Sequence, residues 1–301
     1  MDPLRYLARE RRQGMSETDG PPKIFDRALL RRRLARATRK EPPDFLMTRA
    51  ADDLLDRLLT VKREFPRSLD LGAPTAHFSR AVAASGRAPP LRASRYGGDV
   101  IADEESPPFA PGSFDLIVAG MSLQWVNDLP GALAQARRML APDGLFLACL
   151  AGGASLVELR AAFAQAEEEI TGGASPRVSP FVDVRDMGGL LQRAGFALPV
   201  ADVDSFTLRY DSMFALMDDL RAMGAANVLV KRARKPLRRD VLARAAQIYA
   251  ERFSDPDGRV RASFEIVWAS GWAPHESQQK PAPRGSATIR LEDAMKPPRA
   301  S

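Results

Sequence analysis

Apolar and polar positions in the first half of the chain follow two periods, and their order predicts alternating strands and helices. Continuous apolar runs, as buried parallel strands have, stand at 67–71, 114–119 and 145–150. Segments with apolar residues at helical spacing lie between them, at 75–84 and 128–140. Such alternation is typical of a doubly wound, mostly parallel sheet, so we expect an α/β fold with residues 114–119 inside the sheet.

The second half of the chain predicts an antiparallel edge to this sheet and additional helices. Residues 200–210 alternate between apolar and polar side chains, and 261–269 has the pattern of a last strand. We expect these two strands to pair antiparallel at one edge. A short strand is expected at 100–102. Further helices are expected at 24–40, 45–59, 155–171, 184–194, 212–223 and 239–253.

Helix caps and a turn support these boundaries. Thr75 and Asp128 precede two of the expected helices, and both residue types favour the N-cap position. Ser155 with Glu158 forms a capping-box pattern at the start of another helix. Residues 142–144 read Pro-Asp-Gly, which predicts a turn before the strand that follows.

These elements divide the chain into four expected regions. Residues 1–22 form a tail, and 23–60 form two basic helices. Residues 61–273 form the α/β domain, whose helical additions lie at about 155–195 and 212–253. Residues 274–301 are rich in proline and form an irregular tail.

The composition is sufficient for the hydrophobic core of an enzyme, and it excludes several classes of protein. The chain has 301 residues, 45% hydrophobic and 27% charged, which is enough for an enzyme core. One cysteine, Cys149, excludes a disulfide scaffold, and with only His77 and His275 beside it we expect no metal site. Residues 1–22 lack the apolar region of a signal peptide, and no run is long enough to span a membrane. We therefore expect a cytoplasmic protein, with peripheral binding at the inner membrane as an option.

The net charge of +6 is concentrated near the N-terminus. Residues 23–40 hold eight bases and one acid, a net charge of +7 that leaves −1 for the rest of the chain. The body of the protein therefore gives no reason to expect nucleic-acid binding. The basic segment is either a solvated helix face, or a surface that docks an acidic partner or an anionic lipid.

The first candidate site follows the first expected strand. Asp70 lies next to the end of this strand at Leu71, and Gly72 follows the strand. The missing side chain of Gly72 lets a ligand approach the backbone at a helix N-terminus. The chain continues Ala73-Pro74-Thr75, so the second and third glycines of a dinucleotide fingerprint are absent. The loop is either a ligand site or a plain turn between strand and helix.

Further motifs give this loop a context. Four motifs follow the loop in the sequence, at 103–104, 114–118, 122–130 and 140–144. This series resembles that of class I S-adenosylmethionine-dependent methyltransferases. A narrower resemblance covers about residues 23–290 and is to the mitochondrial complex I assembly factor 5 family and its alphaproteobacterial relatives. Its motifs stand at 103–105, 122–130, 152–153, 158–160, 175–181, 193–196, 219–224, 271–272, 275–278 and 284–287.

The resemblance implies a Rossmann-like fold with S-adenosyl-L-methionine as cofactor. Asp103 would accept a hydrogen bond from the adenine amino group, and Ser94 stands where relatives usually carry the acid that holds the ribose. The resemblance assigns no catalytic residue. The implied cofactor residues are Asp70, Gly72, Ala73, Ser94, Asp103, Glu104 and Met121, and the implied substrate residues are Gln124, Trp125 and Asn127.

Two of these substrate assignments have simpler alternatives in the sequence. Trp125 also suits a core position, and Asn127 with Asp128 also suits a helix start. Three functions stay open at this point. The first is a methyltransferase acting on a protein or, as its alternative, an arginine hydroxylase on the same fold. For mitochondrial members the family implies hydroxylation of an arginine in an iron–sulfur subunit of complex I. The second is a non-catalytic assembly factor with a degenerate cofactor site. The third is a small-molecule methyltransferase of biotin or quinone synthesis.

Overall fold

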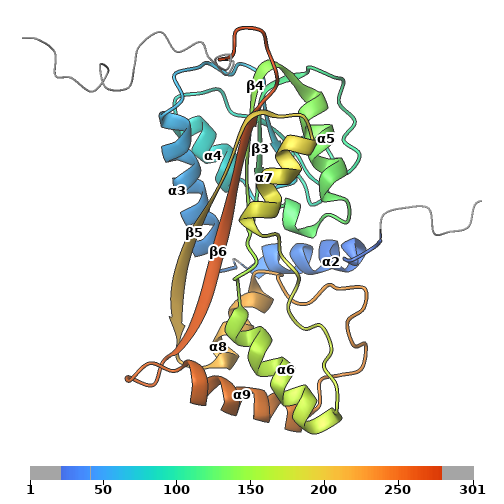
Figure 1. Cartoon of the computed structure of the whole chain (residues 1–301), viewed down its shortest axis with the longest axis vertical. Helices are drawn as coiled ribbons and strands as arrows, with labels where there is room; N and C mark the ends of the chain where they lie inside the picture. The colour runs from blue at the N-terminus through green and yellow to red at the C-terminus, as the bar shows by residue number, and fades with distance from the viewer. Residues whose placement is uncertain (1–21, 41, 280–301) are drawn as a thin grey trace, which may run out of the picture.

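The computed structural model describes residues 22–40 and 42–279, which build one six-stranded sheet with helices on both faces (Figure 1). Residues 1–21 and 280–301, to which most of the two predicted tails belong, lie outside the described residues. The strands are β1 (Ser68–Leu71), β2 (Leu91–Ala93), β3 (Phe114–Gly120), β4 (Leu140–Ala151), β5 (Ala197–Tyr210) and β6 (Val260–Trp272). The helices are α2 (Arg27–Ala37), η1 (Thr38–Lys40), α3 (Phe45–Leu59), α4 (His77–Ala84), η2 (Leu123–Trp125), α5 (Leu129–Met139), α6 (Val157–Thr171), α7 (Val184–Arg193), α8 (Met213–Ala222) and α9 (Arg239–Phe253).

The sheet has the strand order β2–β1–β3–β4–β6–β5, with the expected antiparallel edge. β1, β2, β3 and β4 run parallel, and β3 lies in the interior of the sheet, as predicted for 114–119. β6 pairs antiparallel with β4, and β5 pairs antiparallel with β6. The fold-class prediction is therefore confirmed, including the parallel neighbours at 67–71, 114–119 and 145–150.

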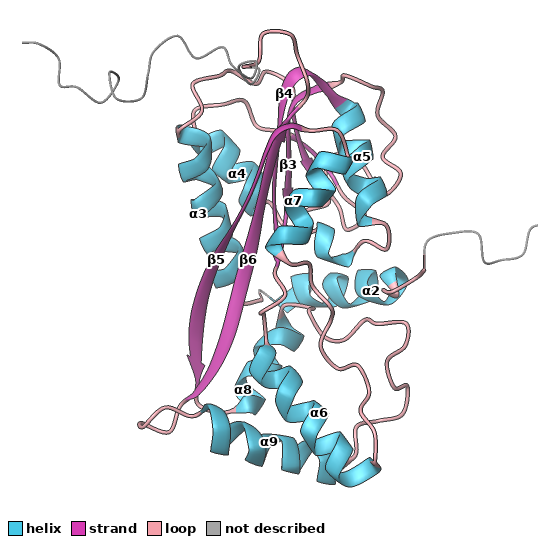
Figure 2. Ribbon diagram, viewed as in Figure 1, coloured by secondary structure: helices cyan, strands magenta, loops and turns pink. Residues whose placement is uncertain are grey.

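Helices cover both faces of the sheet, which explains why its strands are continuous apolar runs (Figure 2). α3 and α4 pack on one face against alternate strand residues such as Leu116 and Leu147. α5 and α7 pack on the other face against Ile117 and Phe146. Because neighbouring strand residues point to opposite faces, each face receives half of every apolar run.

A second lobe of helices is built on the far end of the two long strands. β5 and β6 extend past the parallel strands, and α6, α8 and α9 pack on this extension around a core that includes Tyr249 and Phe264 (Figure 1). α2 lies between the sheet and this lobe. Its N-terminal segment is attached to the loop that follows α8, because Phe25 forms an antiparallel bridge with Leu229.

Several predicted details of the local structure were wrong. The 24–40 helix begins only at Arg27, because Asp26 caps it by accepting a hydrogen bond from the Leu29 N–H. The expected strand at 100–102 is a single bridge from Val100 to Ala93. The expected turn at 142–144 lies within β4, where the pairing with β3 is irregular.

Two of the three predicted helix caps were also wrong. Asp128 does cap α5, accepting from the Gly131 N–H at 2.8 Å. Thr75, however, bonds the ring of His77 and leaves α4 without a side-chain cap. Ser155 and Glu158 form no capping box, because β6 supplies their partners. The Ser155 hydroxyl bonds the backbone of Glu265, and the Glu158 carboxylate accepts from the Ser263 N–H and hydroxyl.

Candidate functional site

A cavity of about 870 Å³ lies where the carboxyl ends of β3 and β4 meet the helical lobe. Met121, Gln124 and Trp125, all directly after β3, line its sheet side. Most of the opposite wall is apolar and comes from the helical lobe and α2. This wall includes Leu34, Leu159, Phe163, Met217, Leu220 and Leu237. Ligands of open α/β sheets bind at this edge, so the cavity is the candidate active site.

Asp70 is buried at the end of β1, beside this edge. Its side chain is 1% exposed, and the Ser79 hydroxyl donates to Oδ2 at 2.6 Å. Within the described part of the chain, Oδ1 has no hydrogen-bond partner, and the nearest guanidinium nitrogen, Nε of Arg92, is 3.9 Å from Oδ2. Burial raises the pKa of Asp70 to about 6, because water no longer solvates the ionised carboxylate.

This raised pKa predicts a pH-dependent effect of Asp70→Asn. In an acid with a raised folded-state pKa, the stabilisation is present below the unfolded value of 3.8 and is lost as the pH rises through about 6. The wild type should therefore lose about 3 kcal/mol relative to Asp70→Asn between about pH 4 and pH 7. Chemical denaturation across this range measures the effect. Asp56→Asn, exposed on α3, is the control, and equal slopes for all three proteins would contradict the prediction.

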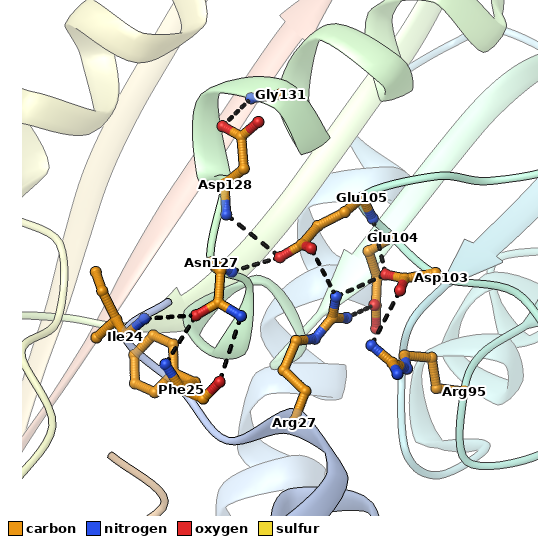
Figure 3. A network of polar contacts seen from close by, with 10 residues as sticks. All are labelled: Ile24, Phe25, Arg27, Arg95, Asp103, Glu104, Glu105, Asn127, Asp128 and Gly131. Carbon is orange, nitrogen blue, oxygen red and sulfur yellow. Dashed lines mark hydrogen bonds and ion pairs between the residues drawn. The ribbon is translucent and has the colours of Figure 1, made fainter. Parts of the chain in front are cut away.

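A buried ion-pair network lies next to the loop after β1 and joins α2 to the segment after β2 (Figure 3). Arg27, only 7% exposed, places its guanidinium among the carboxylates of Asp103, Glu104 and Glu105. Arg95 adds a second guanidinium at 2.9 Å from Asp103. Burial raises the pKa of Glu104 and outweighs the attraction of Arg27. Burial also acts on Asp103, but the Glu105 N–H and the two guanidiniums dominate and lower its pKa.

Glu104 lies directly against Gly72. The glycine has φ +81°, and a Cβ built on it would lie 2.6 Å from Cγ and Oε1 of Glu104 and 2.9 Å from Cβ of Ser122. Glycine is therefore required both for the backbone conformation and for the space. The structure thus brings three predicted cofactor residues, Asp70, Gly72 and Glu104, to one place.

Buried hydrogen-bond acceptors that lack a donor indicate whether the loop after β1 and its neighbours suit S-adenosylmethionine. Oδ1 of Asp70, Oε1 of Glu104 and Oε1 of Gln124 are buried and have no donor among the described residues. Leaving such atoms unpaired costs free energy, so a ligand rich in donors is favoured there. S-adenosylmethionine carries an ammonium group, two ribose hydroxyls and an adenine amino group. The donor-poor site fits these groups.

The other predicted cofactor residues take different positions. Ser94 is buried, and its hydroxyl accepts from the Tyr96 N–H at 3.0 Å. Ala73 is 3% exposed and packs in the core under α4. Met121, with φ +49°, lines the cavity. The role of each residue in binding stays a prediction.

The predicted substrate residues divide into two groups. Gln124 and Trp125 line the cavity, and Trp125 packs edge-on against Phe25. Asn127 instead holds the segment before α2 in place. Its Oδ1 accepts from the N–H groups of Ile24 and Phe25 at 2.8 and 2.7 Å. As placed, Asn127 positions the N-terminal segment over the site and does not line the cavity.

Glu265 is a cavity residue that the sequence did not indicate. It lies on β6 beside the end of β4, and its side chain extends over Gly152, where any Cβ would be 2.2 Å from Oε1. Ser155 bonds both the N–H and the C=O of Glu265, and the Ala154 N–H approaches Oε1 at 3.4 Å. The chain after β4 therefore fixes the backbone of Glu265, and the carboxylate has one long contact from the Ala154 N–H. Its neighbours in β6 have no pattern that would have identified it.

Comparisons with known proteins find a family model, curated relatives and solved structures to which this chain is similar. Residues 45–199 match a family model described as a methyltransferase domain. Arginine-hydroxylase NDUFAF5 of Rattus norvegicus is 38% identical over 90% of this chain and 85% of its own length. The Homo sapiens protein of that name is 39% identical over 91% and 84%. A malonyl-[acyl-carrier protein] O-methyltransferase of Halorhodospira halophila is 34% identical over 91% and 96%. Among solved structures, the YcgJ protein of Bacillus subtilis aligns with a TM-score of 0.49 at 13% identity, covering 74% of this chain and 99% of that chain.

The sheet order and the family match define the class as methyltransferase-like proteins of the class I fold. Within that class, the chain belongs to the family of arginine-hydroxylase NDUFAF5. Both resemblances inferred from the sequence motifs are confirmed, and the membership supports S-adenosylmethionine as the cofactor of this fold. No helix among the described residues has the length and apolar character needed to cross a membrane.

Proposed function

We propose that this chain binds S-adenosylmethionine and modifies an arginine side chain of a protein that is being assembled into respiratory complex I. The observation that carries the proposal is the Glu265 carboxylate in the cavity at the end of β4. The names and identities of the relatives support the choice of arginine.

The Glu265 carboxylate favours a cationic acceptor, because the other charged groups of the lining are paired or exposed to solvent. Two carboxylates line it, and one of them, Asp44, lies 3.3 Å from the ring of His77. Glu265 has only the long contact from the Ala154 N–H and no cationic partner in the described chain. Arg177 and Arg221 pair with carboxylates outside the cavity lining, and Arg80 is exposed on α4.

Glu265 would receive the acceptor, and the loop after β1 would hold the cofactor. A carboxylate binds a guanidinium through two parallel hydrogen bonds, which fixes its orientation as well as its position. Asp70, Glu104 and Asp103 would accept hydrogen bonds from the cofactor, which when bound supplies an activated methyl group. The apolar wall of the cavity would exclude water and hold the methylene groups of the arginine side chain.

Glu265→Gln tests the acceptor site separately from the cofactor site. The carboxamide keeps the shape but loses the charge, so modification of the protein substrate should fall roughly tenfold to a hundredfold. Affinity for S-adenosylmethionine, measured by calorimetry, should stay within about twofold. Glu276→Gln, on an exposed loop, is the matched control. Unchanged modification in Glu265→Gln would exclude this residue from the acceptor site.

Mass spectrometry of complex I subunits tests the function itself. Cells lacking this gene would be complemented with the wild type or with Glu265→Gln, and arginine-containing peptides compared. A gain of one methylene mass assigns a methyltransferase, and a gain of one oxygen mass assigns a hydroxylase of the kind that the relatives' name describes. If S-adenosylmethionine binds but no arginine-containing peptide differs in mass between the strains, the proposal that this chain modifies an arginine is wrong.

A carrier-protein methyltransferase is the second candidate, favoured by the long apolar wall of the cavity. That wall suits an acyl chain, and a relative that is 34% identical is named for this reaction. Its acceptor is a carboxylate, which Glu265 would repel. In this case Glu265→Gln should raise methylation of a malonyl thioester, the opposite of its effect on arginine modification.

A further inference from the structure

A second basic run exists in the chain and lies beside α2. Residues 231–239 contain six bases and no acid. This run does not show in the net charge of −1 for the chain outside residues 23–40, because acids elsewhere offset it. The loop that holds this run passes next to α2 (Figure 1). The two segments are joined by the hydrogen bonds from the Asp26 N–H to the Val228 C=O and from the Val230 N–H to the Ile24 C=O, both 2.8 Å.

Seven cations of the two segments are exposed and unpaired in the described part of the chain. On α2 and η1, Arg31, Arg32, Arg36 and Arg39 are exposed and have no carboxylate within 4.0 Å among the described residues. In the loop, the same holds for Lys231, Arg234 and Lys235. These seven residues are called the basic face below. Like charges repel one another, so gathering them without partners costs stability unless something anionic binds.

Side-chain contacts also join the two segments that carry the basic face. Arg33 of α2 donates to the Asn227 C=O at 2.6 Å, and Arg232 of the loop lies 3.3 Å from Asp26. Burial lowers the pKa of Arg33, and the positive charges of Arg232 and Arg36 lower it further. Where the segments join, Ile24 and Val230 expose 39% and 37% of their surface. Aliphatic side chains beside a polar rim are typical of protein interfaces.

The same two segments form part of the cavity wall. The cavity is lined by residues of the 23–40 segment (Leu34, Ala37 and Thr38) and by residues of the loop between α8 and α9 (Ala226, Asn227 and Leu237). A protein bound to the basic face would therefore lie against the wall of the cavity that receives its side chain.

We propose that the basic face docks an acidic surface of the protein substrate. This inference rests on the proposed function, because it takes the acceptor to be part of a protein. An acidic protein is favoured over a lipid surface because the two segments that carry the basic face also form part of the wall of a substrate cavity. Long-range attraction between opposite charges would speed the encounter and orient the partner before the acceptor side chain enters.

Three triple variants test the docking surface. The first is Arg31→Gln/Arg32→Gln/Arg36→Gln, and the second is Lys231→Gln/Arg234→Gln/Lys235→Gln. The control removes the same charge from other exposed positions: Lys62→Gln/Arg185→Gln/Arg193→Gln. Binding is measured by fluorescence anisotropy against a labelled peptide of glutamate and aspartate, against vesicles of phosphatidylglycerol and phosphatidylcholine, and against duplex DNA.

The peptide should bind the wild type with an affinity that falls as salt rises, and each of the first two variants should weaken it about tenfold. The control should change it less than about twofold. Equal losses in the control, tighter binding to vesicles, or equal binding to DNA would each overturn the proposal. Affinity for S-adenosylmethionine, measured on the same proteins, separates the docking-surface hypothesis from the proposed function. If the cofactor does not bind but the peptide behaves as expected, the docking surface stands and the proposed function fails.

Discussion

Replacing Arg27 by leucine should lower the free energy of unfolding by about 3–5 kcal/mol, because it leaves buried carboxylates without a counter-charge. Glu104, 1% exposed, accounts for most of this loss, since Asp103 and Glu105 are partly exposed to water. The matched control is Arg238→Leu, which breaks an exposed pair with Asp240 and should change the stability little, because water and salt screen exposed ion pairs. Urea denaturation of both variants measures the difference.

The loss in Arg27→Leu should depend on pH. Burial already raises the pKa of Glu104, and removing Arg27 raises it further. The contribution of such an acid is present at low pH and is lost as the pH rises through its folded-state pKa, so the variant should approach the wild type in acid. Arg27→Leu combined with Glu104→Leu should recover most of the stability at neutral pH. If the double variant is as unstable as the single one, packing by Arg27 and not its charge is responsible.

The sheet could be predicted because its determinants are local. Residues 114–119 and 145–150 are apolar on both faces, and only strands covered by helices on both sides require this. The strand pair β5–β6 was found from its alternation, but both strands are longer than predicted. Most of the added residues, 197–199 and 270–272, lie at the end beside β4, where β6 pairs with residues 145–147. This pairing with another part of the chain is not visible in the sequences of the two strands.

The two wrong helix caps have different causes: Thr75 bonds the ring of His77 two residues further on, whereas the partners of Ser155 and Glu158 come from distant parts of the chain. A capping pattern such as Ser155 with Glu158 describes only what neighbouring residues offer one another. In the folded chain, the backbone of Glu265 and the N–H and hydroxyl of Ser263 are stronger competitors for these side chains. Contacts more than a hundred residues away in sequence cannot be read from a local pattern.

The candidate site was predicted in part. The glycine after β1 and the acids at 103–104 were found from motifs, and the structure brings Gly72 and Glu104 into contact. The role of Arg27 was missed, although a signal existed. Arg27 stands three residues before Leu30 and ten before Ala37, so it falls on the buried stripe of a helix on which Arg31, Arg32 and Arg36 face water. A charge on an apolar stripe predicts a buried partner of opposite sign.

Gly72→Ala should be the most damaging single-methyl change at the site, for two separable reasons. The backbone at φ +81° strains any L-residue by about 1–2 kcal/mol. The new Cβ would also collide with Glu104 and Ser122, and overpacking of this kind costs about 1–3 kcal/mol. Gly86→Ala isolates the first effect, because Gly86 has φ +85° and a Cβ added there would have no heavy atom within 4 Å.

The difference between Gly72→Ala and Gly86→Ala therefore measures how tightly Glu104 is held against the loop. Gly72→Ala should also weaken S-adenosylhomocysteine binding by more than about tenfold, whereas Gly86→Ala should leave it unchanged. Adding Glu104→Ala to Gly72→Ala should remove the collision with Glu104 and reduce the loss of stability toward that of Gly86→Ala. It should not restore binding, because Glu104 is itself one of the unpaired acceptors. If the double variant binds as well as the wild type, Glu104 blocks the site and does not contribute to it, and the cofactor assignment of this residue is wrong.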